Sequence, residues 1–303
     1  MKWVVCVILM LVNNLFAQKA VAFLEAPARE KITVADNYIG FTKIPIQTVN
    51  GMILVRAEMD GEEGLFILDT GAPRMVVNSQ ELTGNALSAS SYSTTFDIQS
   101  IIIEQFKWAD VDVRHMEALV LDISHLERST NRKILGMIGY NALTDREVMV
   151  DYDRGELLIY PARKNSVHRM AEPRMTIPFT LQGHLPVINV EICGRVLHFG
   201  LDTGAGTNLI DRKYFDQLPA ESYTNLHLEE IQGLDQAVNM AQTADIKNTI
   251  IAGKGIPDME YLFTDLSHLG PNSGIAIDGI LGYEFFHRFR FSINYQKQKI
   301  YVW

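Results

Sequence analysis

The sequence predicts an all-β fold class, mainly β with a few short helices, arranged as two homologous lobes. Three observations lead to this class. Short apolar runs alternate with turn residues along most of the chain. The letters LDTGA occur twice, 133 positions apart, and the segments around the two copies match in the same order. With 303 residues, 47% of them hydrophobic, the chain is long enough for two lobes.

Each LDTGA stretch ends the second strand of a predicted β-hairpin. In both units an apolar run, a turn and another apolar run precede the stretch, and a short apolar segment follows it. The predicted turns are Asp60-Gly61 in the first unit and Cys193-Gly194 in the second. Since one Asp-Thr-Gly alone is an ordinary turn sequence, the matched surroundings make the repeat informative.

Two further landmarks extend the repeat. The letters LDISHL at 121–126 correspond to TDLSHL at 264–269, and GMIGYNAL at 136–143 corresponds to GILGYEFF at 279–286. Each unit closes with a strand-like ending. Short helices are expected at NALTDRE (141–147) and EFFHRF (284–289). We expect a unit boundary within 161–175, where prolines and charged residues cluster, and lobes at 18–165 and 166–303.

The N-terminus resembles an export signal. Lys2 is followed by about ten apolar residues and then by small residues near Ala17, which predicts a signal peptide at 1–17. A buried N-terminal strand is the alternative. Export predicts a periplasmic or extracellular protein with no membrane span in the mature chain, because the apolar run is shorter than the ~20 residues of a span. Cys6 would leave with the signal, so Cys193 is expected to be an unpaired bystander thiol.

With LDTGA and the segments MIG and ILG in view, the chain resembles the retropepsin-like aspartic proteases, in particular bacterial exported aspartyl proteases with two such units. The resemblance covers roughly residues 45–303. It implies two acid-protease β-barrel lobes of retropepsin or pepsin type, with the active site between them. It implies catalytic residues Asp69 and Asp202, a protein or peptide substrate and no cofactor. The loop-supporting residues would be Thr70, Gly71, Ala72, Thr203, Gly204 and Ala205.

Two carboxylates held about 3 Å apart cannot both ionise easily, so such a pair shares one proton; aspartic proteases are the standard example of this effect. The glycines permit a tight turn, and in the resembled family the two threonines bond across to each other's loop. Ala72 and Ala205 stand where pepsin-like enzymes usually carry a hydroxyl that favours the charged carboxylate. We therefore expect a weakly acidic pH optimum.

Relatives cover the cleft with flap hairpins, for which 88–96 and 229–243 are the candidates. Tyr92 is not assigned as a flap residue, because an exposed loop tyrosine is the simpler interpretation. The recurring Asp-x-Ser-His segments, with Asp122 and Asp265, are interpreted as structural. A serine adjacent to its histidine along a strand would point the wrong way for a Ser/His/Asp site.

Composition excludes other functions. The net charge is −9 and the basic residues are scattered, so no nucleic acid partner is expected. The eight histidines show no metal-ligand spacing, and no phosphate-binding loop is present. Two function classes remain: an exported aspartic endopeptidase, and a catalytically silent relative that binds peptides. We expect a monomer with an internal pseudo-dimer, although pairing of lobes between chains stays open.

Overall fold

The protein is built almost entirely from β-strands, in agreement with the predicted fold class. A computed structural model describes residues 11–12, 41–80, 85–90, 95–163, 167–232, 238–267 and 276–303. The predicted signal peptide at 1–17 lies outside these residues except for β1 (Leu11–Val12), which pairs with β6 (Asn85–Ser90). No helix in the described ranges has the length and hydrophobicity needed to cross a membrane.

The first half of the chain forms a closed ring of strands in the order β3-β4-β9-β5-β8-β7, with β7 pairing back onto β3. Its elements, apart from β6, are β2 (Thr42–Val49), β3 (Met52–Met59), β4 (Glu62–Leu68), β5 (Met75–Asn78), β7 (Thr95–Trp108), β8 (Val111–Leu121), α2 (Ser124–Thr130), β9 (Ile134–Ile138), a 3-10 turn (Tyr140–Ala142), β10 (Arg146–Asp151) and β11 (Glu156–Pro161).

The second half forms a sheet in the order β17-β18-β21-β16-β22-β15-β14-β19-β20, with β13 on β14. Its elements are α3 (Val167–Met170), β12 (Met175–Pro178), β13 (Thr180–Gln182), β14 (Leu185–Ile192), β15 (Arg195–Leu201), β16 (Asn208–Asp211), two 3-10 turns (Arg212–Gln217 and Ala220–Ser222), β17 (Tyr223–Gln232), β18 (Val238–Ile246), β19 (Thr249–Ile251), β20 (Lys254–Ile256), β21 (Met259–Thr264), β22 (Gly279–Leu281), α4 (Tyr283–Phe286), β23 (Phe291–Asn294) and β24 (Lys299–Val302).

The two halves repeat one pattern of strand pairing. In the first, β4 runs parallel to β9 and β5 runs parallel to β8. In the second, β15 runs parallel to β22 and β16 runs parallel to β21. Both predicted hairpin turns are present: Asp60-Gly61 and Cys193-Gly194 all have positive φ, as two-residue hairpin turns require. The sequence repeat is therefore a repeat of structure.

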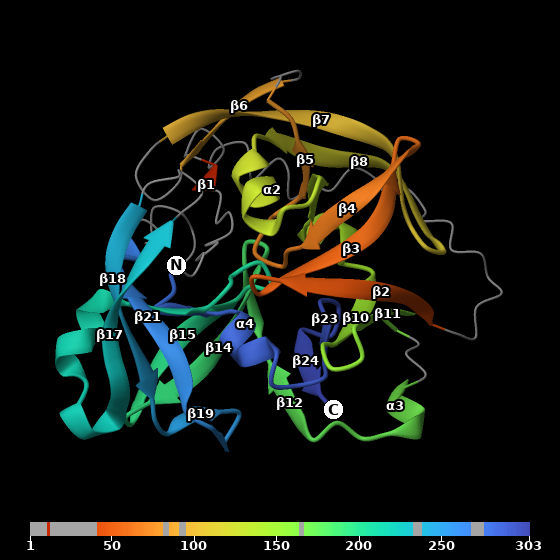
Figure 1. Cartoon of the computed structure of the whole chain (residues 1–303). Coiled ribbons are helices and arrows are strands. Elements are labelled where there is room, and N and C mark those ends of the chain that lie inside the picture. Colours follow the sequence, from red (N-terminus) through yellow and green to blue (C-terminus); the bar gives the residue numbers. More distant parts are fainter. Residues whose placement is uncertain are drawn as a thin grey trace.

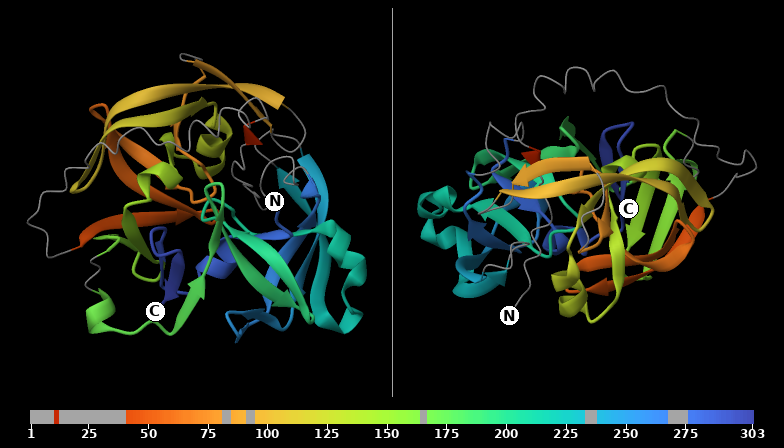
Figure 2. Two further views of the ribbon diagram at one scale, coloured as in Figure 1. Left: turned by 180° about the vertical axis from the view of Figure 1, so that it is seen from behind. Right: turned by 90° about the horizontal axis from the view of Figure 1, so that it is seen from above.

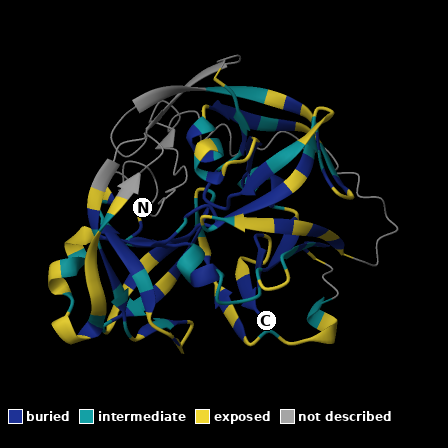
Figure 3. Ribbon diagram, in the orientation of Figure 1, coloured by how far each residue is buried: buried dark blue, intermediate teal, exposed yellow. Residues whose placement is uncertain are grey.

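A third layer joins the halves. Strands β2, β11 and β10 of the first half continue through β23, β24 and β12 of the second in one sheet (Figure 1). At its centre β10 pairs antiparallel with β23, with Glu147 opposite Asn294. This sheet takes strands from both sides of position 165, and α3 lies in the predicted boundary region. Buried residues lie along the strands of both halves and also where the halves meet (Figure 3).

The shared sheet contains a buried polar cluster centred on Glu147. Its carboxylate accepts hydrogen bonds from Ser292 Oγ (2.8 Å) and Asn294 Nδ2 (2.8 Å), and it lies 2.9 Å from Nε2 of His168. The Trp303 indole N–H donates in turn to Ser292 Oγ (3.2 Å). A buried carboxylate is tolerated when its oxygens are bonded in this way. The cluster thus joins the halves by specific contacts as well as by the apolar core.

The structure differs from the prediction at both expected short helices. Residues 141–147 do not form a helix: a 3-10 turn ends at Ala142, and Arg146 begins β10. In the second unit α4 ends at Phe286 rather than 289. Tertiary pairing accounts for the first difference, because all six residues of β10 are buried between β11 and β23.

The segments proposed as flaps fall on two hairpins, β6–β7 and β17–β18. In both views of Figure 2 the β6–β7 hairpin of the first half extends towards the β17–β18 hairpin of the second. Residues 91–94, which include Tyr92, and 233–237 lie outside the described residues. Two hairpins on one side of the molecule are consistent with a cover, and the flap assignment stays a prediction.

Candidate active site

The two LDTGA loops meet at the junction of the halves. Each loop follows a strand that runs beside the hydrophobic-hydrophobic-Gly segment of its own half. The main-chain N–H of Asp69 donates to the Ile138 carbonyl, and that of Asp202 donates to the Leu281 carbonyl, both at 3.0 Å. These equivalent bonds place the two aspartates at equivalent positions of the two halves.

Glycine is required at the segments beneath the loops. A Cβ at Gly139 would lie 2.1 Å from the Arg74 carbonyl oxygen, and one at Gly282 would lie 2.4 Å from that of Thr207. After each glycine the chain returns to its loop: the Tyr140 N–H donates to the Ala72 carbonyl (2.9 Å). The segments MIG and ILG therefore lie directly against the loops and hold them in place.

Asp69 and Asp202 are both fully buried, and they share one hydrogen-bond donor. The N–H of Gly71 lies 2.9 Å from Oδ1 of Asp69 and 3.2 Å from Oδ1 of Asp202. The N–H of Ala72 also donates to Asp69 Oδ1 (3.0 Å), and that of Gly204 donates to Asp202 Oδ1 (2.8 Å). The structure thus brings together two carboxylates that are far apart in the sequence.

Gly71 must be a glycine for steric reasons. A Cβ at this position would lie 2.5 Å from Cγ and from one oxygen of Asp202. Any side chain there would push the two loops apart. The glycine therefore allows the main chain of one loop to contact the carboxylate of the other.

Thr70 and Thr203 lock the loops together. Each threonine accepts the other's main-chain N–H on its hydroxyl, at 3.1 and 2.9 Å. Each hydroxyl also donates across the junction: Thr70 to the Leu201 carbonyl (3.1 Å) and Thr203 to the Leu68 carbonyl (2.9 Å). The methyl groups of Ala72 and Ala205 are buried beside the loops. All eight residues predicted for the site thus gather in one place.

Burial and proximity both perturb the carboxyl groups. Burial, followed by the negative charge of Asp202, raises the pKa of Asp69 well above its usual value. Burial also raises the pKa of Asp202, to about 6, although the N–H groups of Gly204 and Gly71 oppose the shift. The pair therefore retains one shared proton at weakly acidic pH. Protons of such a pair belong to both groups together.

His184 is a site residue that the sequence reasoning missed. Its Nε2 lies 2.7 Å from the carbonyl oxygen of Gly71, on the other half. Since a carbonyl only accepts, Nε2 must carry the proton. Burial lowers the pKa of His184 to about 4, so the ring is neutral at weakly acidic pH. The equivalent position 133 residues earlier is Gly51, which packs against Gly206 instead. An alignment of the two halves would have shown that a histidine in one half stands opposite a glycine in the other.

Two crossed tyrosine pairs surround the loops. Tyr140 packs edge-on against Tyr295 (ring centroids 5.0 Å apart), and Tyr283 packs edge-on against Tyr152 (5.8 Å). Each pair takes one residue from each half. Burial raises the pKa of Tyr295 strongly, and the charges of Tyr140, Asp202 and Asp69 raise it further. Tyr295 therefore belongs to the electrostatic environment of the aspartates.

The described parts of the recurring Asp-x-Ser-His segments form local turns. Asp122 accepts the Ser124 N–H (2.9 Å), and Asp265 accepts the Ser267 N–H (2.9 Å). Ser124 begins α2 rather than a strand, which corrects the reason given for rejecting a Ser/His/Asp site. The structural interpretation stays, because each aspartate caps its own turn.

The fold and the paired carboxylates point to the aspartic protease class, and comparison with known families supports this. Residues 182–293 match the family model described as retroviral aspartyl protease. The matched segment lies in the second half and includes Asp202. A comparison with curated proteins found no match. This half of the chain is therefore similar to retropepsin-like proteases.

Proposed function

We propose that this protein is an aspartic endopeptidase with one active site formed by Asp69 and Asp202. One observation carries the proposal: a single N–H, that of Gly71, bonds both carboxylates inside a buried, cross-linked pair of loops. The shared donor shows how close the two carboxylates lie, and this proximity together with burial makes them share a proton, which lets one act as a base and the other as an acid.

The mechanism follows from the shared proton. The ionised carboxylate of the pair takes a proton from a water molecule while that water attacks the peptide carbonyl carbon. The protonated carboxyl group gives its proton to the carbonyl oxygen. The tetrahedral intermediate collapses as the first group passes the water proton to the leaving amine and the second recovers a proton from the intermediate's hydroxyl, which breaks the C–N bond and restores the pair. No covalent bond to the protein forms, and no cofactor takes part in these steps.

We infer that the natural context is export. The basic start, apolar core and small residues of 1–17 support a cleaved signal peptide and a periplasmic or extracellular enzyme. The shared sheet and the single pair of catalytic aspartates, Asp69 and Asp202 (the dyad), support a monomer whose halves act as an internal pseudo-dimer. The substrate class is polypeptide, because aspartic protease-like sites act on peptide bonds.

The alternative is a silent relative that keeps the fold and binds peptides. To decide, residues 18–303 would be assayed on a peptide library beside Asp69→Asn, Asp202→Asn and the exposed control Asp216→Asn. The proposal expects cleavage by the wild type and Asp216→Asn, inhibition by pepstatin, and losses of about 10³-fold or more in each dyad variant. If wild type and dyad variants behaved alike while all remained folded, the protein would not be an aspartic protease.

A further inference from the structure

A pocket whose lining includes none of the aspartate-loop residues lies beside the shared sheet. Its volume is about 480 Å³. It is formed by the β10–β11 turn of the first half together with β12, β20, the α4–β23 connection and the end of β24. None of the eight loop residues of the candidate active site lines it.

The lining of this pocket is cationic, although the chain carries a net charge of −9. Five basic side chains and two carboxylates line it: Arg154, Arg174, Lys254, Arg288, Arg290, Asp151 and Asp153. One of the carboxylates is already engaged, because Asp151 accepts the main-chain N–H of Arg154 (3.0 Å) and lies 3.9 Å from its Nε. Positive charge is therefore in excess within the pocket.

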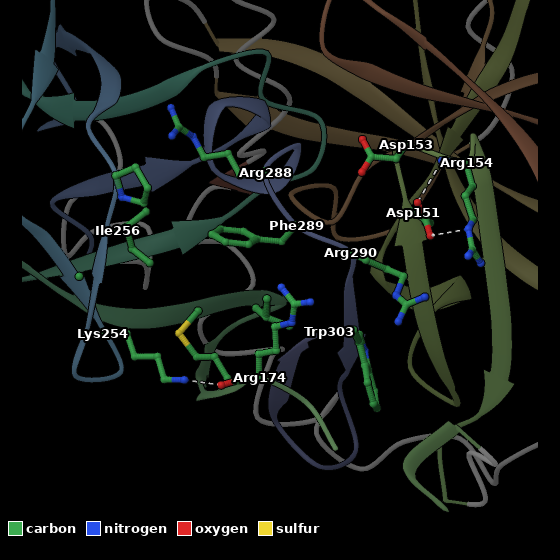
Figure 4. A pocket seen from close by; sticks show the side chains of 14 residues that line it. Asp151, Asp153, Arg154, Arg174, Lys254, Ile256, Arg288, Phe289, Arg290 and Trp303 are labelled. Atoms are coloured by element: carbon green, nitrogen blue, oxygen red, sulfur yellow. Dashed lines mark hydrogen bonds and ion pairs between the residues drawn. The ribbon is translucent and has the colours of Figure 1, made fainter. Parts of the chain in front are cut away.

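Arg174 and Arg290 contribute to that excess. Among the residues that the structure describes, neither guanidinium forms an ion pair, whereas Arg288 donates to two main-chain carbonyls, those of Glu284 and Asp258. Figure 4 shows both side chains among those that line the pocket, Arg174 from just before β12 and Arg290 from just before β23. The Arg290 side chain is only partly exposed. A guanidinium group matches a carboxylate or phosphate, which accepts several charge-assisted hydrogen bonds.

The walls around these arginines are fixed and partly apolar. Lys254 Nζ donates to the Arg174 carbonyl, and the Trp303 N–H donates to the Arg290 carbonyl (2.8 Å). Trp303 is held further by its indole bond to Ser292. Phe289 is the second aromatic residue in the lining, besides Trp303. The arginine-bearing segments are thus anchored before any ligand arrives, which reduces the entropic cost of binding.

We propose that this pocket binds a small organic anion. Its carboxylate or phosphate group lies between Arg174 and Arg290, and its apolar part lies against Phe289 and Trp303. The site is independent of peptide hydrolysis. Because its lining comes from both halves, a bound anion stabilises the folded chain through its preference for the folded state.

Calorimetric titration at fixed ionic strength tests the proposal. The probes are phenyl phosphate, benzoate and inorganic phosphate, applied to the full chain. The test variant is Arg174→Gln/Arg290→Gln. The matched control is Arg56→Gln/Arg132→Gln, which removes the same charge outside the pocket. We expect saturable binding of phenyl phosphate or benzoate. The dissociation constant should rise at least about tenfold in the test variant, because charge-assisted hydrogen bonds are lost.

Three comparisons sharpen the outcome. The control should stay within about twofold of wild type, and inorganic phosphate should bind more weakly than phenyl phosphate if the aromatic wall contributes. Asp69→Asn/Asp202→Asn should bind as wild type does, which separates this site from the proposed protease activity. Arg174→Gln alone, at an exposed position, serves if the double variant fails to fold. Absence of saturable binding to about 10 mM, or equal weakening in test and control, would overturn the proposal.

Discussion

The N–H of Thr70 donates to Oγ1 of Thr203 at 3.1 Å, and the N–H of Thr203 donates to Oγ1 of Thr70 at 2.9 Å. These two residues lie 133 positions apart and are both buried. Their reciprocal bonds make each half necessary to satisfy the main chain of the other. The loops of the dyad are therefore one cooperative unit.

Thr70→Val should destabilise the fold by about 2–4 kcal/mol. Valine keeps the shape of threonine but leaves the Thr203 N–H and the Leu201 carbonyl buried without partners. Thr70→Ser keeps the hydroxyl and should cost less than about 1 kcal/mol. Urea unfolding of the three proteins measures the difference. Equal stability of the valine and serine variants would show that the cross-bonds contribute nothing.

The dyad should make the protein less stable as pH rises through the weakly acidic range. A carboxyl group with a raised pKa binds more protons in the folded state, so the free energy of unfolding falls with rising pH. For Asp202 the fall runs from about 3.8, its ordinary pKa, to about 6 in the folded protein. Above about pH 6 the free energy of unfolding stays at its lowered value, because the Asp202 carboxyl group is ionised in both the folded and the unfolded state.

Asp69→Asn/Asp202→Asn should therefore gain stability over wild type, by roughly 1–3 kcal/mol between about pH 4 and pH 6. Both proteins keep His184, whose lowered pKa gives the opposite slope, so that contribution cancels in the difference. Denaturant unfolding across this range, with Asp216→Asn as a surface control, provides the measurement. A constant difference between variant and wild type at all pH values would contradict the shared-proton assignment.

Ala72→Ser should move the pH–rate profile towards acid. The Ala72 N–H already lies 3.0 Å from Asp69 Oδ1, so a serine hydroxyl at this position can donate to the same carboxylate. Such a bond favours the charged form and should lower the acidic apparent pKa of kcat/KM by about 0.5–1. The wild type should peak at weakly acidic pH; a peak near pH 2 would contradict this. Ala109→Ser, in the exposed β7–β8 turn, should leave the profile unchanged.

His184→Leu should lower kcat about 10–100-fold with little change in KM. His184 contacts the main chain of Gly71 and acts by positioning the N–H that bonds both carboxylates. His184→Gln, which can still donate, should restore most of the rate. Steady-state kinetics and the pH profile distinguish this role from a general effect on folding. A rise in KM as large as the fall in kcat, or a glutamine variant as slow as the leucine variant, would argue against a positioning role.

Much of the candidate site could be predicted because it is encoded twice. The same local signals recur in the same order in both halves: an apolar run, Asp-Thr-Gly-Ala, and a later hydrophobic-hydrophobic-Gly segment. In each half the strand before Asp-Thr-Gly-Ala pairs with that segment. His184 escaped because it occurs in only one half. The tyrosine pairs and the Glu147 cluster escaped because they depend on which strands of the third sheet become neighbours. The predicted helix at 141–147 failed for the same reason, since pairing of β10 decides that segment.

The pairing of β10 with β23 also sets an order of events in time. Its partners are about 145 residues apart in the sequence, as with Glu147 and Asn294, and contacts of such separation form late because a long chain must first be closed. During synthesis the first half can complete its own ring of strands, but β10 has no partner on that side until β23 emerges. The first half therefore cannot form the pair of aspartates alone, and chemistry at the pair waits until the second half has folded against it.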